Sequence, residues 1–542
     1  MPPGPGIAAV LRATPEEMRK ISTYDALVVG AGAAGSLAAM LLTQAGLRVL
    51  ILDASSPRSI IRSPLRRLTG SLVRRLSEPA GLGLLPAALI PKGRRALKVL
   101  GRWRQPIQSR CYAWERAPDA FVDDIDCPYV TPPNRPFVWV RARVLGGRME
   151  IPGHGRQYYR LGPTDFAPSD GLSVPWPLKP GELDPWYSFV ERRLNLAGMY
   201  DELPWIPDSD LSRVLDPTPS ELELKRAINS RWPSAQPLLS RYAPPPAPLE
   251  AAARTGRLLC CQNAIVRQIE VDDFGHVRGV VWVDQEDGTE QRALAPLIFL
   301  CASALESTRL LLLSRSRRCP DGLGASSGVL GRFLMDHVVL KAEGVGPGLL
   351  SKCAVQDQEE GRCLYLPRFD ARDLPEPKPG RGFGIQLYQS QVGRGQTYFV
   401  AVSFGEMLPR RENRVMLDVQ RRDAWGIPVL RIECAHNELE LARAADQATA
   451  LQALAEIAGV TLSNIDAAPE PPGIAVHECG TARMGSDPAN SVLDPHNQCW
   501  EAQGLYVTDG SCFASQGNQN PTLTILAITA RACDHALRTR TR

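Results

Sequence analysis

A glycine-rich loop near the start of the chain has the spacing of a dinucleotide-binding turn. Gly30, Gly32 and Gly35 directly follow a short apolar run, and Asp53 ends a second such run. The first glycine of such a turn permits the tight bend, the second lets a pyrophosphate approach the backbone, and the third lets helix and strand pack closely. Asp53 is placed to bind a ribose hydroxyl. The order strand, glycines, helix, strand and acid favours a dinucleotide site rather than a glycine turn that binds no ligand. It does not distinguish FAD from NAD.

A second polar group opens the last helix that we predict. Asn520 is followed by Pro521 and Thr522. Proline suits the first helical position, because the N–H that it lacks would have no partner there. The positive end of this helix would favour negative charge on a ligand. His477 is one of only seven histidines in the chain, and histidine is the side chain best suited to accept a proton near neutral pH. A lone histidine is more often a core or surface group without a chemical role.

Two motifs that suggest other chemistry fail in their context. The segment 324–328 reads Gly-Ala-Ser-Ser-Gly, which matches the turn around a hydrolase nucleophile, Ser326. No apolar strand precedes it, so the strand–turn–helix context is missing. His477-Glu478 begins like a zinc-protease motif, but position 481 is Thr. A hydrolase is therefore a weak alternative, and we expect no metal site.

The elements that must position these residues can be predicted from periodicity and turn signals. The first strand covers 26–29, and the next runs over 48–52. A hairpin is predicted from 262–270 and 276–283 across the turn 272–275. Further predicted elements are helices at 36–45, 221–229, 305–313, 438–457 and 522–537, strands at 297–301 and 505–508, and a β-rich stretch at 349–428.

Length and composition limit the class of protein. A chain of 542 residues predicts two or three domains. With 44% hydrophobic and 22% charged residues the composition is that of an ordinary globular protein. We find neither an apolar run of about 18 residues nor a secretory signal. A net charge of +4 is too weak to imply nucleic acid, and 13 cysteines without a CxxC pair suit reduced thiols in a cytoplasm.

The segment 57–110 is strongly basic. It carries eleven Arg and two Lys against one acid, Glu78. Leucines at 65, 68, 72 and 76 have helical spacing, which predicts an amphipathic helix with a basic face. A solvated, charge-paired surface helix is the simpler interpretation. Contact with an anionic membrane surface or an acidic partner is the alternative.

Longer stretches resemble the glucose–methanol–choline (GMC) oxidoreductases and keep the order of that family from residue 24 to the C-terminus. Those that carry the resemblance are 143–148, 301–310, 331–337, 477–485, 491–495, 505–511 and 520–525. Four more are similar to the flavoprotein subunits of bacterial glucoside 3-dehydrogenases and gluconate dehydrogenases, at 184–187, 404–410, 423–428 and 497–499.

The resemblance implies FAD and hydride transfer from a hydroxyl-bearing carbon to flavin N5. His477 would take the hydroxyl proton, and Asn520, where the family carries His or Asn, would hydrogen-bond the substrate oxygen. The implied cofactor residues are Gly30, Gly32, Gly35 and Asp53, Gly146 and Gly147 of the second glycine segment, Val266 toward the adenine, Asp509 and Gly510 along the ribityl–pyrophosphate, and Pro521 and Thr522 at the N1–O2 edge of the flavin.

The stretch 148–159 departs from the family pattern. It is about two residues longer than in the relatives and lacks the expected Trp. Some relatives attach FAD covalently through a histidine in this vicinity, so His154 is a weak candidate for such a link. The departure puts in doubt the flavin environment, its oxygen reactivity and the substrate.

The expected fold is α/β, with a Rossmann-like FAD-binding domain and an inserted α+β substrate domain built on an antiparallel sheet. We expect FAD-domain parts at 24–180, with the basic insertion, at 251–345 and at 471–542. The substrate domain would comprise 181–250 and 346–470.

The expected activity is that of a dehydrogenase rather than an oxidase, acting on a secondary alcohol of a sugar, glycoside or sugar acid. Electrons would pass to a quinone, a haem subunit or another carrier, and a small partner subunit is a further candidate partner. Alternatives are a polycyclic or natural-product alcohol as substrate, and a non-catalytic flavoprotein subunit. We expect a cytoplasmic protein, or a periplasmic one exported with a signal-bearing partner.

Overall fold

A parallel sheet carries the glycine-rich loop at the end of its central strand. Its strands lie in the order β18-β10-β1-β2-β6, and each neighbouring pair is parallel. They are β1 (Ala26–Val29), β2 (Val49–Leu52), β6 (Leu258–Cys261), β10 (Ile298–Leu300) and β18 (Leu505–Val507). The computed structural model describes residues 24–56, 72–73, 76, 90–153, 156–168, 170–203, 206–244, 247–346, 361–369, 381–391 and 396–540.

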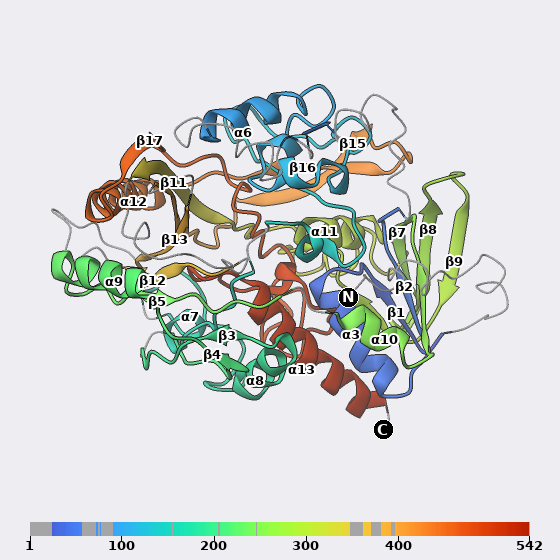
Figure 1. Cartoon of the computed structure of the whole chain (residues 1–542). Coiled ribbons are helices and arrows are strands. Elements are labelled where there is room, and N and C mark those ends of the chain that lie inside the picture. Colours follow the sequence, from blue (N-terminus) through green and yellow to red (C-terminus); the bar gives the residue numbers. More distant parts are fainter. Residues whose placement is uncertain are drawn as a thin grey trace.

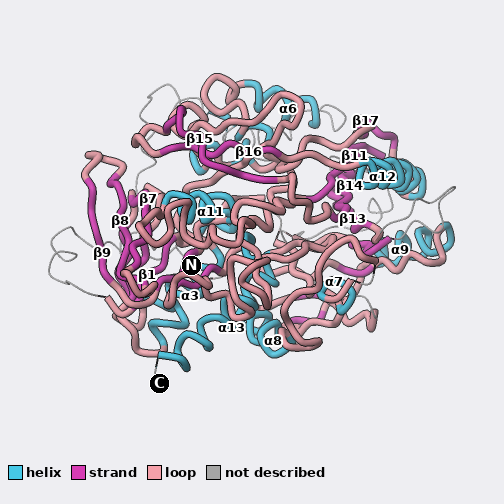
Figure 2. Tube along the Cα trace, turned by 180° about the vertical axis from the view of Figure 1, so that it is seen from behind, coloured by secondary structure: helices cyan, strands magenta, loops and turns pink. Residues whose placement is uncertain are grey.

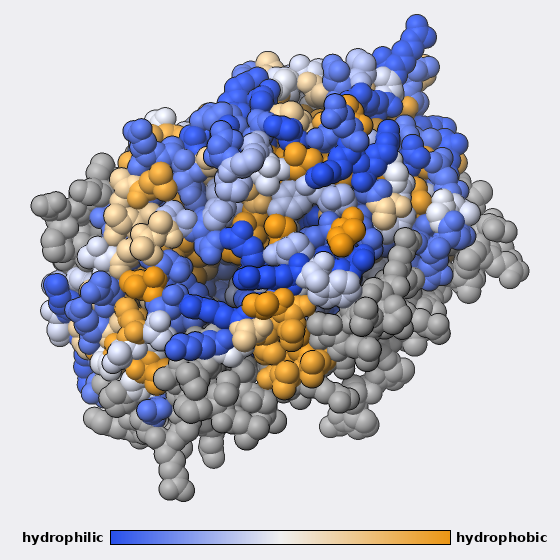
Figure 3. Space-filling model, turned by 90° about the horizontal axis from the view of Figure 1, so that it is seen from above, coloured by the Kyte–Doolittle hydropathy of each residue, from blue (hydrophilic) through white to orange (hydrophobic). Residues whose placement is uncertain are grey.

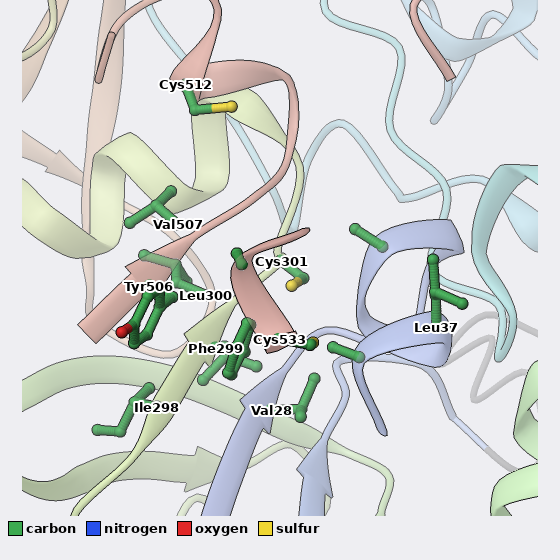
Figure 4. Close-up of a cluster of buried hydrophobic side chains, with 14 of the residues drawn as sticks. Val28, Leu37, Ile298, Phe299, Leu300, Cys301, Tyr506, Val507, Cys512 and Cys533 are labelled. Atoms are coloured by element: carbon green, nitrogen blue, oxygen red, sulfur yellow. The ribbon is translucent and has the colours of Figure 1, made fainter. Parts of the chain in front are cut away.

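Four strands of this sheet consist of buried, mostly apolar residues. All residues of β1, β2, β10 and β18 are buried, as continuous apolar strands of a covered parallel sheet require. Phe299 and Tyr506 stack across β10 and β18 with ring centroids 5.1 Å apart. Figure 4 shows this pair, with Val28 of β1 nearby.

Helices pack below the sheet in Figure 1, and an antiparallel ribbon flanks it on the right. Helix α3 packs against both α10 and α13. It begins at Ala33, three residues before the predicted start, because the turn already ends at Gly32. These elements are α3 (Ala33–Gln44), α10 (Pro248–Ala253), α11 (Ala304–Leu313), α13 (Thr522–Arg540), β7 (Ala264–Val271), β8 (Val277–Asp284) and β9 (Glu290–Leu294). The predicted hairpin is confirmed as the antiparallel pair β7–β8.

A second, antiparallel sheet forms the other half of the molecule, on the left in Figure 1. Its order is β17-β11-β14-β13-β12-β5. Helix α12 contacts β11, β14 and β17, and α9 contacts α12. The bounds are β5 (Leu238–Leu239), β11 (His337–Gly346), β12 (Leu364–Phe369), β13 (Phe383–Gln391), β14 (Thr397–Glu406), β17 (Thr461–Ile465), α9 (Pro219–Arg231) and α12 (Glu438–Ile457). The strongly periodic helix predicted at 438–457 is thus confirmed at both ends.

Smaller elements complete the described part. They are α6 (Ile90–Val99), α7 (Pro163–Phe166), α8 (Asp184–Leu194), β3 (Ala197–Gly198), β4 (Arg213–Val214), β15 (Arg414–Arg422), β16 (Pro428–Glu433), and the short 3-10 helices η2 (Gln108–Arg110), η3 (Trp114–Arg116), η4 (Pro118–Ala120), η5 (Gly147–Glu150) and η7 (Gly510–Cys512). Seen from behind in Figure 2, α8 and α13 lie together at the lower edge, and the two helices are in contact.

Helix α6 belongs to the basic segment 57–110 and lies on the upper face of the molecule in Figure 1. Figure 3 looks down on it and shows a largely hydrophilic surface with hydrophobic groups between. Val99 and Trp103 are 53% and 47% exposed there. Most of 57–89, including Leu65 and Leu68 of the predicted amphipathic helix, lies outside the described residues. Within the described ranges, no helix is both long and apolar enough to cross a membrane.

Candidate active site

The glycine-rich loop joins β1 to the start of α3 and leaves space above its middle glycine. A Cβ on Gly35 would lie 1.9 Å from the carbonyl oxygen of Gly30, so this glycine serves close packing of helix on strand. A Cβ on Gly32 would meet no heavy atom within 4 Å. Gly32 caps α3 without a side-chain hydrogen bond, and the first turn of α3 holds no acidic residue. The loop therefore offers an open surface beside backbone N–H groups, which suits a phosphate.

Asp53 is anchored to this loop. Its Oδ2 accepts the N–H of Ala31 at 2.7 Å, and its Oδ1 accepts the N–H of Ser55 at 2.8 Å. Each carboxylate oxygen has a further lone pair, so Asp53 can still accept ribose hydroxyls. The predicted ribose contact is geometrically open.

One large cavity, of about 960 Å³, adjoins the loop and extends between the two sheets. That volume lies near the upper end for small-molecule and cofactor sites. Its lining includes Gly30, Gly32, Asp53, Gly147, Val266, His477, Asp509, Gly510, Asn520, Pro521 and Thr522. Of the predicted site residues, Gly35 and Gly146 do not line it. Gly35 packs beneath the loop, and Gly146 precedes the lining residue Gly147.

The second glycine segment touches the first one. Gly147 opens η5 with a φ of +75°, and a Cβ on it would lie 2.8 Å from the Cα of Gly32. Asp509 lies across the cavity at the start of η7, where its carboxylate accepts hydrogen bonds from Ser307 and Ser511. Burial raises the pKa of Asp509. Asp509 thus holds the end of β18 to α11 as well as lining the cavity.

The loop that carries His477 is held by a buried carboxylate. Asp336 accepts the backbone N–H groups of Gly473, Ala475 and His477 at 2.6, 3.1 and 3.0 Å. Burial, reinforced by the negative charge of Glu478, raises the pKa of Asp336 to about 7. This contact presents His477 to the cavity.

A second histidine, His337, sets the tautomer of His477. Its Nε2 lies 3.1 Å from the carbonyl oxygen of Gly517, which can only accept. Burial lowers the pKa of His337 to about 4, so near neutral pH it has a single ring N–H. That N–H belongs to Nε2, and Nδ1 is left as an acceptor. The Nδ1 atoms of His337 and His477 are 2.9 Å apart, so His477 donates from Nδ1.

Gln516 supports this assignment independently. Its amide nitrogen donates to the carbonyl oxygen of His477 at 2.7 Å and lies 3.3 Å from Nδ1 of His337. A nitrogen that donates to both partners requires an acceptor at Nδ1 of His337. His477 consequently carries no proton at Nε2, and an unprotonated ring nitrogen is what a general base needs.

Asn520 faces this base at the start of α13. Its Nδ2 lies 3.3 Å from Nε2 of His477. Pro521 follows, and Thr522 begins the helix as predicted. The first turn of α13 has no acidic residue, so its positive end can stabilise negative charge in the cavity.

Arg148 connects the second glycine segment to the same loop. Its guanidinium donates to the carbonyl oxygen of Val476 at 3.1 Å and to the carboxylate of Glu478 at 3.2 Å. Glu478 is almost fully buried, whereas the Arg148 side chain is 27% exposed. The contact holds together two cavity walls that are far apart in the sequence.

These features fit FAD. The open surface over Gly32, the contact of Gly147 with it, and two helix starts without acidic residues match a ligand with a pyrophosphate and a second region of negative charge. The residues that would hold it are Gly30, Gly32, Asp53, Gly147, Val266, Asp509, Gly510, Pro521 and Thr522. His154, the candidate for a covalent link, lies outside the described residues.

Sequence reasoning missed several residues of the site. His337 stood inside a family-like segment but had no role assigned to it. Gln157, Gln386 and Tyr388 carried no motif at all, and they line the cavity beside Asn520. Gln386 and Tyr388 are placed by the pairing of β13 in the antiparallel sheet, and Gln157 by its bridge to Tyr242, and no local pattern specifies either contact.

Comparisons with known proteins show similarity to one family of oxidoreductases. Residues 409–529 match the family described as GMC oxidoreductase, and residues 28–57 match an NAD(P)-binding Rossmann-like domain. The 2-methyl-1,2-propanediol dehydrogenase of Mycolicibacterium austroafricanum is 27% identical over 73% of this chain and 80% of its own length. The paromamine 6'-oxidase of Streptomyces fradiae is 26% identical over 95% and 90%. A fructose dehydrogenase large subunit from Gluconobacter japonicus is 26% identical over 51% and 53%.

The fold is likewise similar to that of solved oxidase structures. The crystal structure of a pyridoxine 4-oxidase from Mesorbium loti superposes with a TM-score of 0.57 over 96% of this chain and 99% of that one, at 20% identity. Residues of both matched segments, among them Gly32, Asp53, His477 and Asn520, line the one cavity described above. Residues 409–529 thus match the GMC oxidoreductases, and the chain as a whole is similar to oxidoreductases and has the fold of FAD flavoproteins.

Proposed function

We propose that this protein oxidises a secondary alcohol of a sugar, glycoside or sugar acid to a ketone. The observation that carries the proposal is the pair formed by His477 and Asn520. An unprotonated imidazole nitrogen and an amide N–H donor lie 3.3 Å apart on the wall of the cofactor cavity. An alcohol oxygen that lies beside both atoms, at hydrogen-bond distance from each, can give its proton to one and accept a hydrogen bond from the other.

The chemistry balances with these two groups. Nε2 of His477 takes the hydroxyl proton as the O–H bond breaks, and Nδ2–H of Asn520 donates to the oxygen as negative charge develops on it. Bound FAD supplies the two-electron acceptor for the hydride that leaves the carbon, so that the C=O bond forms. A positioned base contributes about 10²–10⁴-fold to the rate, and one donor to a developing oxyanion about 10²–10³-fold.

The substrate class rests on the cavity wall and on the relatives. Next to Asn520 the wall carries Gln157, Gln386, Tyr388 and Gln389, which offer donors and acceptors for several hydroxyl groups. The names of the relatives include a diol dehydrogenase and a fructose dehydrogenase. Both support an alcohol rich in hydroxyl groups.

A second candidate substrate is a polycyclic or natural-product alcohol. Strand β14 contributes Val400, Val402 and Phe404 to the cavity wall. This apolar stripe would pack against fused rings, and it also suits the apolar face of a sugar ring. The substrate panel below separates the two classes.

The electron acceptor is a further part of the proposal. We propose a dehydrogenase that passes electrons to a quinone, a haem subunit or another carrier. The fructose dehydrogenase large subunit is by its name part of a larger assembly, which supports a partner. Comparing reoxidation of the reduced protein by O₂ and by a soluble quinone tests this point, and fast reoxidation by O₂ alone would instead indicate an oxidase.

The first experiment records the visible spectrum of the FAD-loaded protein anaerobically, before and after adding sugars, glycosides, sugar acids and polycyclic alcohols. We expect one hydroxylated sugar class to bleach the flavin bands. His477→Ala should keep the flavin bands and slow the bleaching by about 10²–10⁴-fold. His276→Ala is the matched control, because His276 is exposed on the turn after β7.

Two outcomes would contradict the proposal. The absence of flavin bands after reconstitution with FAD would contradict the cofactor site. Bleaching by His477→Ala at the wild-type rate would remove His477 as the base.

A further inference from the structure

A chain of hydrogen bonds crosses the cavity wall from the substrate sheet to Asn520. Gln157 Nε2 lies 2.9 Å from the carbonyl oxygen of Gly361 and 2.8 Å from the hydroxyl of Tyr388. That hydroxyl lies 2.8 Å from Oε1 of Gln386. Nε2 of Gln386 lies 2.7 Å from Oδ1 of Asn520. Each group of this chain lines the cavity.

The first carbonyl determines the direction of every bond in the chain. Gly361 can only accept, so the atom of Gln157 that faces it is the amide nitrogen. The same nitrogen donates to Tyr388, whose single proton is then given to Gln386. Gln386 therefore presents its oxygen to Tyr388 and its nitrogen to Asn520.

The same direction follows from the opposite end. The carbonyl of Gly517 places the proton of His337 on Nε2, and His477 consequently carries its proton on Nδ1. The lone pair at Nε2 of His477 requires a donor, so Asn520 must present its nitrogen to His477 and its oxygen to Gln386. Two backbone carbonyls, Gly361 and Gly517, thus assign one consistent order to all the side-chain protons between them.

We propose that Gln386 is a positioning residue of the reaction, which orients the amide of Asn520 so that its N–H groups face His477 and the substrate oxygen. Tyr388 and Gln157 anchor Gln386 in turn. Gln386 is 3% exposed on β13, and its side chain acts through Asn520. The inference deepens the proposed function and rests on it for its rate measurement.

The orientation matters because the amide of Asn520 has two unlike ends. Turned by half a rotation, it would place Oδ1 against the lone pair of His477 Nε2. It would also withdraw the donor that stabilises the developing alkoxide. Loss of a donor of this kind costs about 10²–10³-fold in rate.

Exchange of the donor on Gln386 tests the proposal. Gln386→Glu is nearly isosteric and still accepts from Tyr388, but its carboxylate cannot donate to Asn520, so the amide should turn. Gln386→Met removes both bonds and leaves the amide without a fixed partner. We expect Gln386→Glu to slow anaerobic flavin reduction by about 100-fold and Gln386→Met by about 10-fold.

The order of the two variants discriminates between roles. If Gln386 only filled space, the isosteric Gln386→Glu would be the milder change. Gln420→Glu makes the same amide-to-carboxylate exchange on the exposed end of β15, away from the cavity wall, and we expect it to stay within about 3-fold of the wild type. Gln386→Glu equal to or faster than Gln386→Met would overturn the proposal.

A readout without substrate separates this proposal from the proposed function. In FAD-loaded protein labelled with ¹⁵N only at histidine, solid-state NMR distinguishes protonated from bare ring nitrogens. The signals of His477 are those lost in His477→Ala. We expect a bare Nε2 in the wild type and a protonated Nε2 in Gln386→Glu, because a turned Asn520 would offer its oxygen there.

The outcomes remain distinct. If no alcohol bleaches the wild-type flavin, the proposed function fails, and the NMR signals alone decide the orientation. If Gln386→Glu does not fold or bind FAD, Tyr388→Phe takes its place. It removes the anchor of Gln386 and should slow reduction by about 2- to 10-fold. An unchanged rate together with unchanged His477 signals would overturn the proposal.

Discussion

At the scale of single residues, the site depends on which atom carries each proton. His477 can act as a base because His337 is neutral and already donates to a backbone carbonyl. Histidine alone would leave either ring nitrogen protonated. The unprotonated ring nitrogen of His477 is therefore selected by a buried neighbour that does not line the cavity.

The role of His337 predicts a difference between two substitutions. His337→Asn keeps an acceptor oxygen near Nδ1 of His477, whereas His337→Phe removes it. Flavin reduction by the substrate should therefore slow by about 100-fold in His337→Phe and clearly less in His337→Asn. Stopped-flow absorbance of FAD-loaded protein measures both rates, and equal losses would indicate that His337 acts only through packing.

His337 also predicts a pH dependence of stability. The pKa of His337 is about 4 in the folded chain, against an ordinary value of 6.5 that applies to the unfolded chain. Between pH 4 and pH 6.5 the unfolded chain therefore binds more protons than the folded one. The stabilisation that comes from neutral, buried His337 is therefore fully present above pH 6.5, and the free energy of unfolding falls as the pH drops from 6.5 toward 4. In urea unfolding at several pH values, the free energy of unfolding of His337→Asn should fall less than that of the wild type between pH 6.5 and pH 4, by up to about 3 kcal/mol. His436, whose pKa burial also lowers to about 4, keeps a residual slope.

At the scale of elements, two glycines at the start of α3 have different roles: the surroundings of Gly32 suit ligand binding, and those of Gly35 suit packing. Gly32 has open space around its missing Cβ, and Gly35 has the carbonyl of Gly30 there. Both belong to the same motif, and they face opposite sides of it.

Gly32→Ala and Gly35→Ala should consequently fail in different ways. Gly32→Ala should fold with a thermal midpoint near that of the wild-type apoprotein, while the added methyl group blocks the approach of a pyrophosphate and weakens FAD binding by at least about 10-fold. Gly35→Ala should lose about 1–3 kcal/mol of stability even without FAD. Thermal unfolding and FAD titration, each on both apoproteins, check this, and similar profiles for the two variants would contradict it.

At the scale of the whole molecule, the cavity is closed by contacts between distant parts of the chain. Arg148 and Glu478 are 330 residues apart in the sequence. Gln386 comes from the antiparallel sheet, and Asn520 from the start of α13 beside the parallel sheet. The active site therefore exists only where the two sheets meet.

Breaking the Arg148–Glu478 pair should affect the fold as a whole. Arg148→Met leaves the buried carboxylate of Glu478 without its cationic partner and should lower the free energy of unfolding by about 2 kcal/mol. The matched control is the double variant with Glu478→Gln, which removes the uncompensated charge and should recover part of the loss. Urea unfolding of the four proteins gives the coupling, and strictly additive losses would show that the pair is not coupled.

Much of the fold was predictable from local patterns. The hairpin β7–β8, the helix at 438–457 and the strand before the glycine loop follow from periodicity and turn residues, which depend only on near neighbours. The sequence pattern puts the start of α3 three residues late, because the small residues of its first turn carry little amphipathic signal. The amphipathic helix predicted in the basic segment lies mostly outside the described residues.

The sequence by itself determined the cofactor loop, because that loop is a short motif with fixed spacing, and through its resemblance to a known family it predicted His477 and Asn520 as the residues that hold a proton and an oxygen. Only the tertiary structure decided which nitrogen of His477 is bare and which end of Asn520 faces it. Those choices depend on His337 and Gln386, which come from β11 and β13, and on two carbonyl groups that belong to neither motif. Hydrogen-bond direction is a property of all partners in a chain together, so no single segment could reveal it.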